Sequence, residues 1–520
     1  MTGLTAMVLS CAPLLLLDNR ASAAKKSCLI RTRYGVYNGF VGKRGVQTWL
    51  GIPYAKPPVG KLRFQAPQKL EPSDAEFDAK KFGFAPRQDE DPMEPASLTP
   101  KSEDCLTLNI WTRPHEGLKP VMVFIPGGGF VNGGTSDPLY NGTNLAASQD
   151  VVVVTLNYRL NIYGFMNFGA IDSNFETSGY NGIMDQLAAI EWVKENIEQF
   201  GGDPENITLF GESAGASSVS LLMVAPAAKG LFQKAIAESG SCAYYHTPEM
   251  AAEIAEGFMR SGGFRNMNEV MLKSADELET IYEKFYIERG FTSESDYFPM
   301  CDGKFLPLHP YHALKNGAAK GIKFLSGNTG EEYRYWLLYL KDFVVNTKKY
   351  HKQATSTVYE GEFTNSEEIY EAWRKNHMDI PEDSRYFEFA NQLDWRVGQE
   401  LAAEYQSAFD DVYLYLFNEK SPISHLGSCH MMELPYVFGN PVEFVAPKLV
   451  GKLVKQMQAS WGAFAATSNP NNALIPEWKP YTVDDRQTME INSKAWTCRK
   501  DLNTQNLNEL RSFYEDNLLD

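Results

Sequence analysis

The amino-acid sequence predicts an α/β protein, in which a mostly parallel central sheet is covered by helices on both faces. Short apolar runs rich in β-branched residues alternate with helical patterns along the chain, which is typical of parallel strands joined by helices. No repeat, low-complexity linker or break in composition divides the 520 residues, so we expect a single large domain with helical insertions. The hydrophobic share of 43% and the charged share of 22% exclude a disordered chain and a multi-span membrane protein.

The predicted strands are short apolar runs, and they are Val121–Phe124, Val151–Thr155, Ile207–Phe210, Lys234–Glu238, Ile322–Leu325 and Val412–Phe417. The clearest helix is Asp185–Phe200, where apolar residues recur every three or four positions. Two further stretches, Met250–Phe291 and Asn365–Gln406, are rich in Glu, Lys and Ala and are predicted to be helical.

The first 24 residues have the features of an export signal. The apolar run Leu4–Leu17 is too short to span a bilayer, and Ala21-Ser22-Ala23 has the small residues of a cleavage site. No Lys or Arg precedes this run, and a buried N-terminal segment is the alternative. We expect a secreted or extracytoplasmic protein whose mature domain covers residues 25–520. Sequons at Asn141 and Asn206 leave glycosylation open.

The charge balance and the cysteines argue against several functions. Lys and Arg number 49 against 65 Asp and Glu, a formal net charge of −16, and no basic cluster suits nucleic acid. After the first 24 residues no run is apolar enough for stable membrane insertion. The seven cysteines form no C-x-x-C pair, so a zinc or redox site is not expected, and the chemistry described below needs no metal or cofactor.

A candidate nucleophile, Ser213, lies in the segment Gly211-Glu-Ser-Ala-Gly215. The strand before it and the small-residue helix Ala214–Met223 after it match the nucleophile elbow, a sharp strand-to-helix turn with the pattern G-x-S-x-G. Glycines allow the strand and helix to approach closely, and the helix N-terminus favours negative charge at the serine. The five-residue pattern alone is weak, and a structural turn is the alternative, but the strand–turn–helix context favours catalysis.

Three glycines, Gly127 to Gly129, follow the predicted strand Val121–Phe124. Lipases and esterases use a glycine-rich segment at this point, and its backbone N–H groups bind the oxyanion of the tetrahedral intermediate. We expect Gly128, Gly129 and Ala214 to provide these donors. A glycine-rich strand exit is the alternative, whereas a phosphate-binding P-loop is excluded because no G-K-[ST] follows.

The chain resembles the type-B carboxylesterases, the cholinesterase-like branch of the α/β hydrolases, over nearly all residues after the export signal. Matching segments occur in the order of the family, and they are Leu50–Phe64, Ser102–Trp111, Pro126–Phe130, Asn157–Arg159, Asp185-Gln186 and Phe200–Gly215. The resemblance implies one α/β-hydrolase domain that cleaves small-molecule carboxylic esters through an acyl-enzyme intermediate, without a cofactor.

The resemblance also indicates the catalytic base, which follows the nucleophile and the acid in this fold. His430 begins a match to the family pattern His-x-x-Glu-Leu-Pro-Tyr and is the predicted base, and His425 is the alternative. The remaining late histidines, His351 and His377, lie in polar stretches and are predicted to be exposed.

The predicted acid is Glu332, the last residue of a match to the family segment G-x-T/N-x-x-E that starts at Gly327. The adjacent Glu331 is the alternative. By resemblance, Glu212 and Ser241 are expected close to this Ser-Glu-His triad, and purely structural hydrogen bonding is the alternative for both.

Two departures from the family bear on the substrate. A cysteine that usually pairs with the one at Cys105 is replaced by Pro86, so we expect no disulfide to close the loop Arg87–Lys101. In cholinesterases this loop carries the tryptophan that binds choline, and here it contains none. Because a quaternary ammonium group needs such an aromatic face, acetylcholine is not the expected substrate.

Three functions are compatible with these sequence features. The first is a serine carboxylesterase acting on neutral esters. The second keeps this chemistry but changes the substrate: a lipase, a thioesterase, or an esterase that deacylates polymers or toxins. The third is a non-catalytic, neuroligin-like adhesion module, but such relatives usually lose the serine that this chain retains as Ser213.

Overall fold

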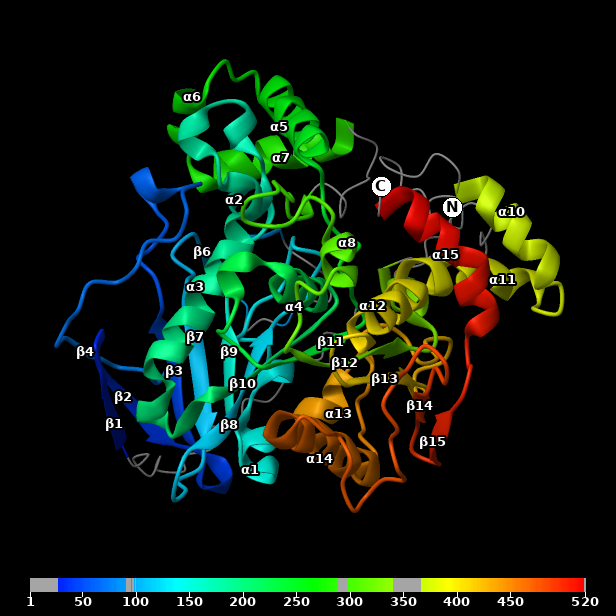
Figure 1. Cartoon of the computed structure of the whole chain (residues 1–520). Helices are drawn as coiled ribbons and strands as arrows, with labels where there is room; N and C mark the ends of the chain where they lie inside the picture. The colour runs from blue at the N-terminus through cyan, green and yellow to red at the C-terminus, as the bar shows by residue number, and fades with distance from the viewer. Residues whose placement is uncertain are drawn as a thin grey trace, which may run out of the picture.

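The computed structural model describes residues 27–518, except 90–94, 96–97, 99, 289–296 and 340–365. The predicted export signal, residues 1–24, and His351 lie outside the described residues. In the described part, one large sheet of 13 strands crosses the molecule, in the order β1-β2-β3-β7-β9-β8-β10-β11-β12-β13-β14-β15, with β4 paired to β2 (Figure 1).

The middle of this sheet is parallel and its two edges are antiparallel, except for the short parallel pair of β2 and β4. The parallel strands are β8 (Lys119–Ile125), β9 (Val152–Leu156), β10 (Gly202–Glu212), β11 (Lys234–Glu238), β12 (Lys323–Thr329), β13 (Val412–Phe417) and β14 (Thr488–Ile491). The remaining strands are β1 (Ser27–Thr32), β2 (Gly35–Val41), β3 (Gln47–Pro53), β4 (Glu76–Phe77), β7 (Thr107–Thr112), β15 (Trp496–Arg499) and the separate pair β5 (Ala85–Pro86) and β6 (Lys101–Ser102).

Buried side chains alternate between the two faces of the central strands. In β8, Val121, Val123 and Ile125 belong to one hydrophobic core, whereas Met122 and Phe124 belong to a second core. This alternation follows from the two-residue period of a strand, and a strand buried on both faces is apolar throughout. The prediction of a mostly parallel sheet covered on both faces is confirmed.

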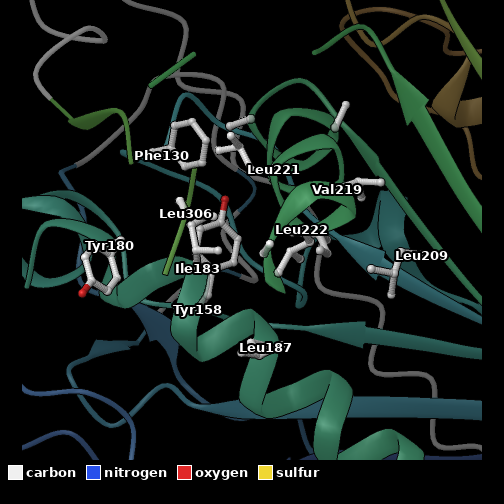
Figure 2. Close-up of a cluster of buried hydrophobic side chains, with 14 of the residues drawn as sticks. Phe130, Tyr158, Tyr180, Ile183, Leu187, Leu209, Val219, Leu221, Leu222 and Leu306 are labelled. Carbon is white, nitrogen blue, oxygen red and sulfur yellow. The ribbon is translucent and has the colours of Figure 1, made fainter. Parts of the chain in front are cut away.

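Different helices cover the two faces. The first helix layer contacts one face of the sheet and consists of α3 (Asn181–Asn196), α4 (Ala214–Val224) and α12 (Val397–Ser407). The second layer contacts the other face and consists of α1 (Thr143–Gln149) and α14 (Gly451–Thr467). The helix α13 (Leu434–Phe438) packs on α14. Figure 2 shows the core under the first layer, where Ile183 and Leu187 of α3 lie with Leu221 and Leu222 of α4.

The predicted helical stretches are helical with interruptions. Asp185–Phe200 corresponds to α3 and the 3-10 turn η8 (Ile197–Phe200). The stretch from Met250 contains α5 (Pro248–Gly262), α6 (Met267–Met271) and α7 (Ala275–Glu288), which gather at the top of Figure 1. The later stretch contains α10 (Ser366–Asn376), α11 (Glu382–Ala390), the π-helical turn η13 (Asn391–Arg396) and α12.

The other helices are α2 (Asn161–Phe165), α8 (Pro310–Lys315) and the C-terminal α15 (Thr504–Leu518). Within the described residues, no helix combines the length and the apolar composition needed to cross a membrane. The carboxyl ends of β10, β11, β12 and β13 lie at one edge of the parallel sheet, which is where α/β folds bind ligands.

Candidate active site

Ser213 lies at the turn between the end of β10 and the start of α4, as the G-x-S-x-G pattern predicts. Its backbone has φ 58° and ψ −126°, a conformation that costs a non-glycine residue about 1–3 kcal/mol. Two hydrogen bonds hold the turn, because Ser213 N donates to Glu238 O (2.9 Å) and Ser217 N donates to Ser213 O (2.9 Å). Ser213 is partly exposed, whereas its neighbours Glu212 and Ala214 are buried.

The glycines on either side of Ser213 allow this close approach. A Cβ on Gly211 would lie 2.6 Å from the backbone carbon of Gly215, and a Cβ on Gly215 would lie 2.0 Å from Ile125 O. Any side chain at either position would displace the strand or the helix.

His430 lies in the loop between β13 and α13, and its side chain is buried with 5% of the residue exposed. Its ring nitrogen Nδ1 lies 2.5 Å from Glu332 Oε2, and its backbone N–H donates to Glu332 O (3.1 Å). A carboxylate on Nδ1 holds the imidazole in the tautomer that leaves Nε2 free to accept a proton. The structure therefore brings together the predicted base and the predicted acid.

Glu332 is the first residue of the 3-10 helix η11 (Glu332–Tyr339), three residues after the end of β12, and it is fully buried. Its second oxygen, Oε1, accepts hydrogen bonds from Ser239 Oγ (2.6 Å) and Thr329 N (2.7 Å). Both carboxylate oxygens are thus bound, and the carboxylate is fixed in orientation toward the imidazole.

Glu331, the alternative acid, makes other contacts, and His425, the alternative base, lies at the surface. Glu331 accepts a hydrogen bond from Ser428 N (3.0 Å) and forms an ion pair with Arg334 (2.7 Å). His425 is exposed. Of the two adjacent glutamates, Glu332 is the one that contacts the histidine.

The glycine-rich segment after β8 lies against the predicted nucleophile. A Cβ on Gly127 would lie 3.0 Å from Ser213 Cβ, so the backbone here passes very close to the serine. Gly128 and Gly129 have φ of 109° and 58°, which favours glycine. In the described part of the chain, the amides of Gly128, Gly129 and Ala214 donate no hydrogen bond.

Glu212 lies at the other ring nitrogen of the histidine, with Oε1 3.0 Å from His430 Nε2. Burial raises the pKa of Glu212 to about 7, although the charge of His430 opposes this rise and that of Glu332 adds to it. Burial alone would lower the pKa of the imidazole, but Glu212 and Glu332 together raise it to about 9. The two carboxylates therefore favour the charged imidazole in the free enzyme.

Two site residues were not found from the sequence. Ser239, rather than Ser241, donates to Glu332, and the Ser241 hydroxyl accepts from Tyr311 instead (2.8 Å). Glu433 accepts from Tyr415 (3.0 Å), and burial raises its pKa to about 8, to which the charge of Glu332 also contributes. Ser239 was detectable in principle, since it follows β11 at the sheet edge where β10 also ends.

Three aromatic rings surround the histidine. The ring centroids of Trp395, Trp336 and Tyr335 lie 4.6, 5.2 and 6.1 Å from that of His430. These side chains come from η13 and η11, and they were also not predicted. They form an apolar wall beside the imidazole.

The prediction that His377 is exposed is wrong. Its ring stacks on Trp373 with centroids 4.0 Å apart, and its Nε2 lies 2.9 Å from Glu509 of α15. The contact with α15 buries this histidine, and α15 follows it by more than a hundred residues, which a local pattern does not reveal.

Cys105 forms no disulfide with any described residue, as expected from Pro86. Burial raises the pKa of the Cys105 thiol and that of Cys429, next to the histidine, so neither is a thiolate nucleophile. Within the described residues, no cluster of His, Cys, Asp or Glu is arranged to hold a metal ion.

A serine at a strained strand-to-helix turn, with a histidine and a glutamate supplied by later strands of a parallel sheet, defines the α/β-hydrolase class. The model of the Carboxylesterase family matches residues 26–510, and the chain belongs to this family. It is a carboxylic ester hydrolase.

Relatives of known sequence and structure agree with this assignment. The chain is 37% identical to para-nitrobenzyl esterase of Bacillus subtilis (strain 168), over 90% of this chain and 95% of that protein. It is 32% identical to the medium-chain fatty acyl-CoA hydrolase precursor of Anas platyrhynchos, over 89% of each chain. A thermophilic PNB esterase structure superposes with a TM-score of 0.83 at 33% identity, over 93% of this chain and 99% of the other.

Proposed function

We propose that Ser213, His430 and Glu332 form the catalytic triad of this ester hydrolase, and that its substrates are small neutral carboxylic esters. The observation that carries the proposal is the 2.5 Å contact between His430 Nδ1 and Glu332 Oε2. Ser213 directly follows Glu212, whose carboxylate is 3.0 Å from His430 Nε2, so the serine and this nitrogen belong to the same small region.

The proposed reaction begins when a substrate ester binds with its carbonyl carbon at Ser213. A serine hydroxyl is a weak nucleophile, and His430 Nε2 takes its proton as the oxygen attacks the carbonyl. Glu332 remains ionised on Nδ1 and stabilises the imidazolium. His430 then protonates the departing alcohol, and water hydrolyses the acyl-enzyme by the same route.

The amides of Gly128, Gly129 and Ala214 are the proposed oxyanion hole. Their hydrogen bonds are unused in the described residues, and Ala214 opens α4, where the helix dipole favours negative charge. One such donor is worth about 3 kcal/mol in the transition state.

The triad is tested by hydrolysis of p-nitrophenyl acetate by Ser213→Ala and by Ser220→Ala. Ser220 is a matched control in the same helix, because its buried hydroxyl has no hydrogen-bond partner within the described part of the chain. We expect Ser213→Ala to lower kcat by at least about 10⁴-fold, and Ser220→Ala to stay close to wild type. Equal rates for wild type and Ser213→Ala would remove Ser213 from the mechanism.

The acyl and alcohol preferences are a separate question, and thioesters are the second candidate substrates. The same chemistry cleaves thioesters, and the relative from Anas platyrhynchos is called a fatty acyl-CoA hydrolase. A series of p-nitrophenyl esters with increasing acyl length, and acyl-CoA thioesters of the same lengths, would separate esterase, lipase and thioesterase by kcat/KM.

We also propose that the protein is exported from the cytoplasm, because residues 1–24 have the composition of an export signal. Mass spectrometry of the N-terminus of the secreted or extracytoplasmic protein tests it. A mature chain that begins near Lys25 supports cleavage and export. A cytoplasmic protein that keeps its first residues contradicts them.

A further inference from the structure

The indole ring of Trp395 packs against the imidazole of His430. The centroids are 4.6 Å apart and the rings are inclined by 43°, and Trp395 is buried with 8% exposed. A second tryptophan, Trp336, lies 5.2 Å from the imidazole and 6.0 Å from Trp395. A distance below about 6 Å is within the range at which an aromatic ring attracts a cation.

The backbone that carries Trp395 is the π-helical turn η13, and several hydrogen bonds fix it. Tyr244 OH donates to Asp394 O (2.7 Å), and Tyr333 N donates to Asn391 Oδ1 (3.1 Å). Arg396 donates to Asn328 Oδ1 at the end of β12 (3.2 Å). π-Helical turns are rare and occur frequently at functional sites.

The indole N–H does not explain the position of Trp395. Within the described residues, Trp395 Nε1 is buried and has no hydrogen-bond partner. Buried donors of this kind are uncommon in folded proteins and call for an explanation. The ring is therefore placed by its contacts with other rings, and phenylalanine at this position would lose no hydrogen bond.

We propose that Trp395 is a positioning residue for His430, which holds the imidazole plane and stabilises its protonated form through the indole ring. This inference rests on the proposed triad. When His430 takes the proton of Ser213, the ring becomes a cation, and tryptophan attracts a cation more strongly than tyrosine or phenylalanine does. The same wall keeps water from the imidazole.

Other charges also act on the imidazole. The carboxylates that face it are Glu212 at the end of β10, Glu332 at the start of η11 and Glu433 before α13. All three favour the imidazolium, so a contribution from Trp395 must be measured with these carboxylates in place.

The experiment compares Trp395→Leu with Trp395→Phe and uses Trp373→Leu as a matched control. Trp373 of α10 stacks on His377, which follows that helix and contacts Glu509 of α15, so the control removes a tryptophan from a second Trp-His-Glu group. The measurements are kcat and KM for p-nitrophenyl esters of several acyl lengths, and the pH profile of kcat/KM.

Trp395→Leu should lower kcat about tenfold at every acyl length and move the acid limb of kcat/KM to lower pH, because the protonated imidazole loses stabilisation. Trp395→Phe should keep kcat and the acid limb close to those of the wild type, and Trp373→Leu should change neither. An unchanged acid limb and kcat in Trp395→Leu would overturn the proposal. An effect confined to KM and dependent on acyl length would also overturn it, since that is the result expected of a pocket wall.

A second measurement avoids the risk that leucine disturbs folding. Fluorinated tryptophans weaken the attraction of the ring for a cation with little change in shape. With increasing fluorination, the acid limb of the wild type should move progressively to lower pH, whereas that of Trp395→Phe, which keeps only the more distant Trp336 near the imidazole, should move clearly less. The same shift in both proteins, or none in either, would overturn the proposal. Activity retained by Ser213→Ala would instead show that the triad itself is wrong.

Discussion

Glu212 Oε1 lies 3.0 Å from His430 Nε2, at the ring nitrogen opposite the one that Glu332 contacts. The nitrogen that is proposed to take the proton of Ser213 therefore has a carboxylate beside it in the free enzyme. This contact lacks the alignment of a hydrogen bond, since neither atom has a hydrogen-bond partner in the described residues. A substrate or the serine hydroxyl can thus compete for Nε2 without first breaking an aligned hydrogen bond.

The first prediction concerns the pH dependence of hydrolysis. The base must be neutral to take a proton, and the two carboxylates raise the pKa of His430 to about 9. Activity should therefore rise with pH into the alkaline range. Glu212→Gln removes one of the charges that favour the imidazolium, so the pKa of His430 falls and the acid limb of kcat/KM moves to lower pH.

Glu205→Gln is the control for this change of charge, because Glu205 is exposed and pairs with Lys194. Its acid limb should match that of the wild type. If Glu212→Gln also left the limb in place, or moved it to higher pH, then Glu212 would not control the protonation of the base.

The second prediction separates two adjacent glutamates. Glu332→Gln keeps the shape of the side chain but removes the carboxylate on His430 Nδ1, and we expect kcat to fall about 10⁴-fold, as in other triads whose acid is replaced by its amide. Glu331→Gln should retain most of the activity, because Glu331 contacts Ser428 N and Arg334. Steady-state kinetics with p-nitrophenyl acetate test both, and a larger loss in Glu331→Gln would reverse the assignment.

The sheet was predictable because its central strands are buried on both faces. Val412–Phe417 is apolar at almost every position, and β13 has the same limits. The turn at Ser213 was predictable because the strand and the helix approach each other closely at Gly211 and Gly215, where a side chain does not fit. The G-x-S-x-G pattern between a strand and a helix indicates this approach.

The contacts around the proposed triad depend on geometry that a sequence pattern does not contain. Ser239 and Ser241 are two residues apart, and only the backbone, with φ 53° at Ser239, decides which hydroxyl donates to Glu332. Trp395 lies within the π-helical turn η13, where the α-helical period does not hold, so a pattern with that period does not predict the direction of its side chain.

The third prediction concerns the proposed oxyanion hole. Gly128 has φ 109°, and a Cβ there would lie 2.2 Å from Asn132 O, so Gly128→Ala must displace the backbone that carries the proposed donors. We expect a loss of about 10²–10³-fold in kcat, the cost of one lost oxyanion donor. Gly321→Ala is the control, since Gly321 has φ 97° with nothing within 4 Å of its Cβ. Steady-state kinetics should show the loss of kcat in Gly128→Ala alone, and thermal unfolding should show that both variants are folded.

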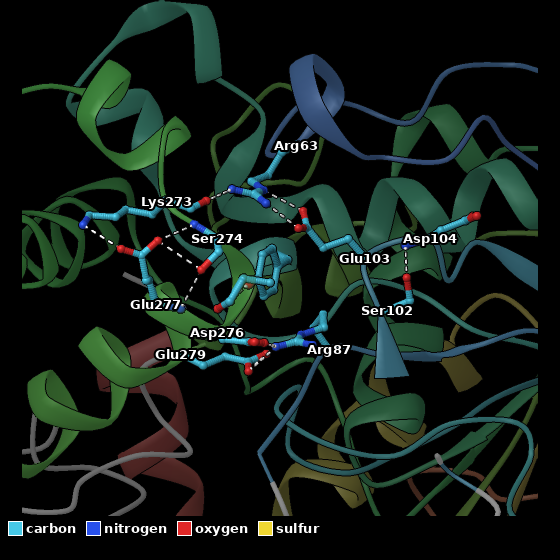
Figure 3. Close-up of polar contacts among 12 residues, drawn as sticks. Arg63, Arg87, Ser102, Glu103, Asp104, Lys273, Ser274, Asp276, Glu277 and Glu279 are labelled. Atoms are coloured by element: carbon cyan, nitrogen blue, oxygen red, sulfur yellow. Dashed lines mark hydrogen bonds and ion pairs between the residues drawn. The ribbon is translucent and has the colours of Figure 1, made fainter. Parts of the chain in front are cut away.

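Ion pairs connect Arg87, the residue after Pro86, to Asp276 and Glu279 of the helix α7 (Figure 3). Arg87 binds both carboxylate oxygens of Glu279 (2.6 and 2.5 Å) and also contacts Asp276 (2.5 Å). Arg63 binds Glu103 and donates to Lys273 O (2.7 Å) just before the same helix. These contacts lie beside Pro86, where the resemblance implies that the usual disulfide to Cys105 is lost, and they attach Arg87 to α7 without a covalent bond.

The fourth prediction is that this attachment depends on salt. Arg87→Gln should lower the free energy of unfolding by about 1–2 kcal/mol, because a two-pronged, partly buried ion pair contributes more than an exposed one. The loss should be smaller at about 1 M salt, where charges are screened over a few ångströms, than at about 0.05 M salt. Arg260→Gln, which removes an exposed pair to Glu256 with a separation of 3.6 Å, should have little effect in either condition. Thermal unfolding of the three proteins tests this, and equal stability of Arg87→Gln and wild type at low salt would show that the ion pairs of Arg87 do not stabilise the protein.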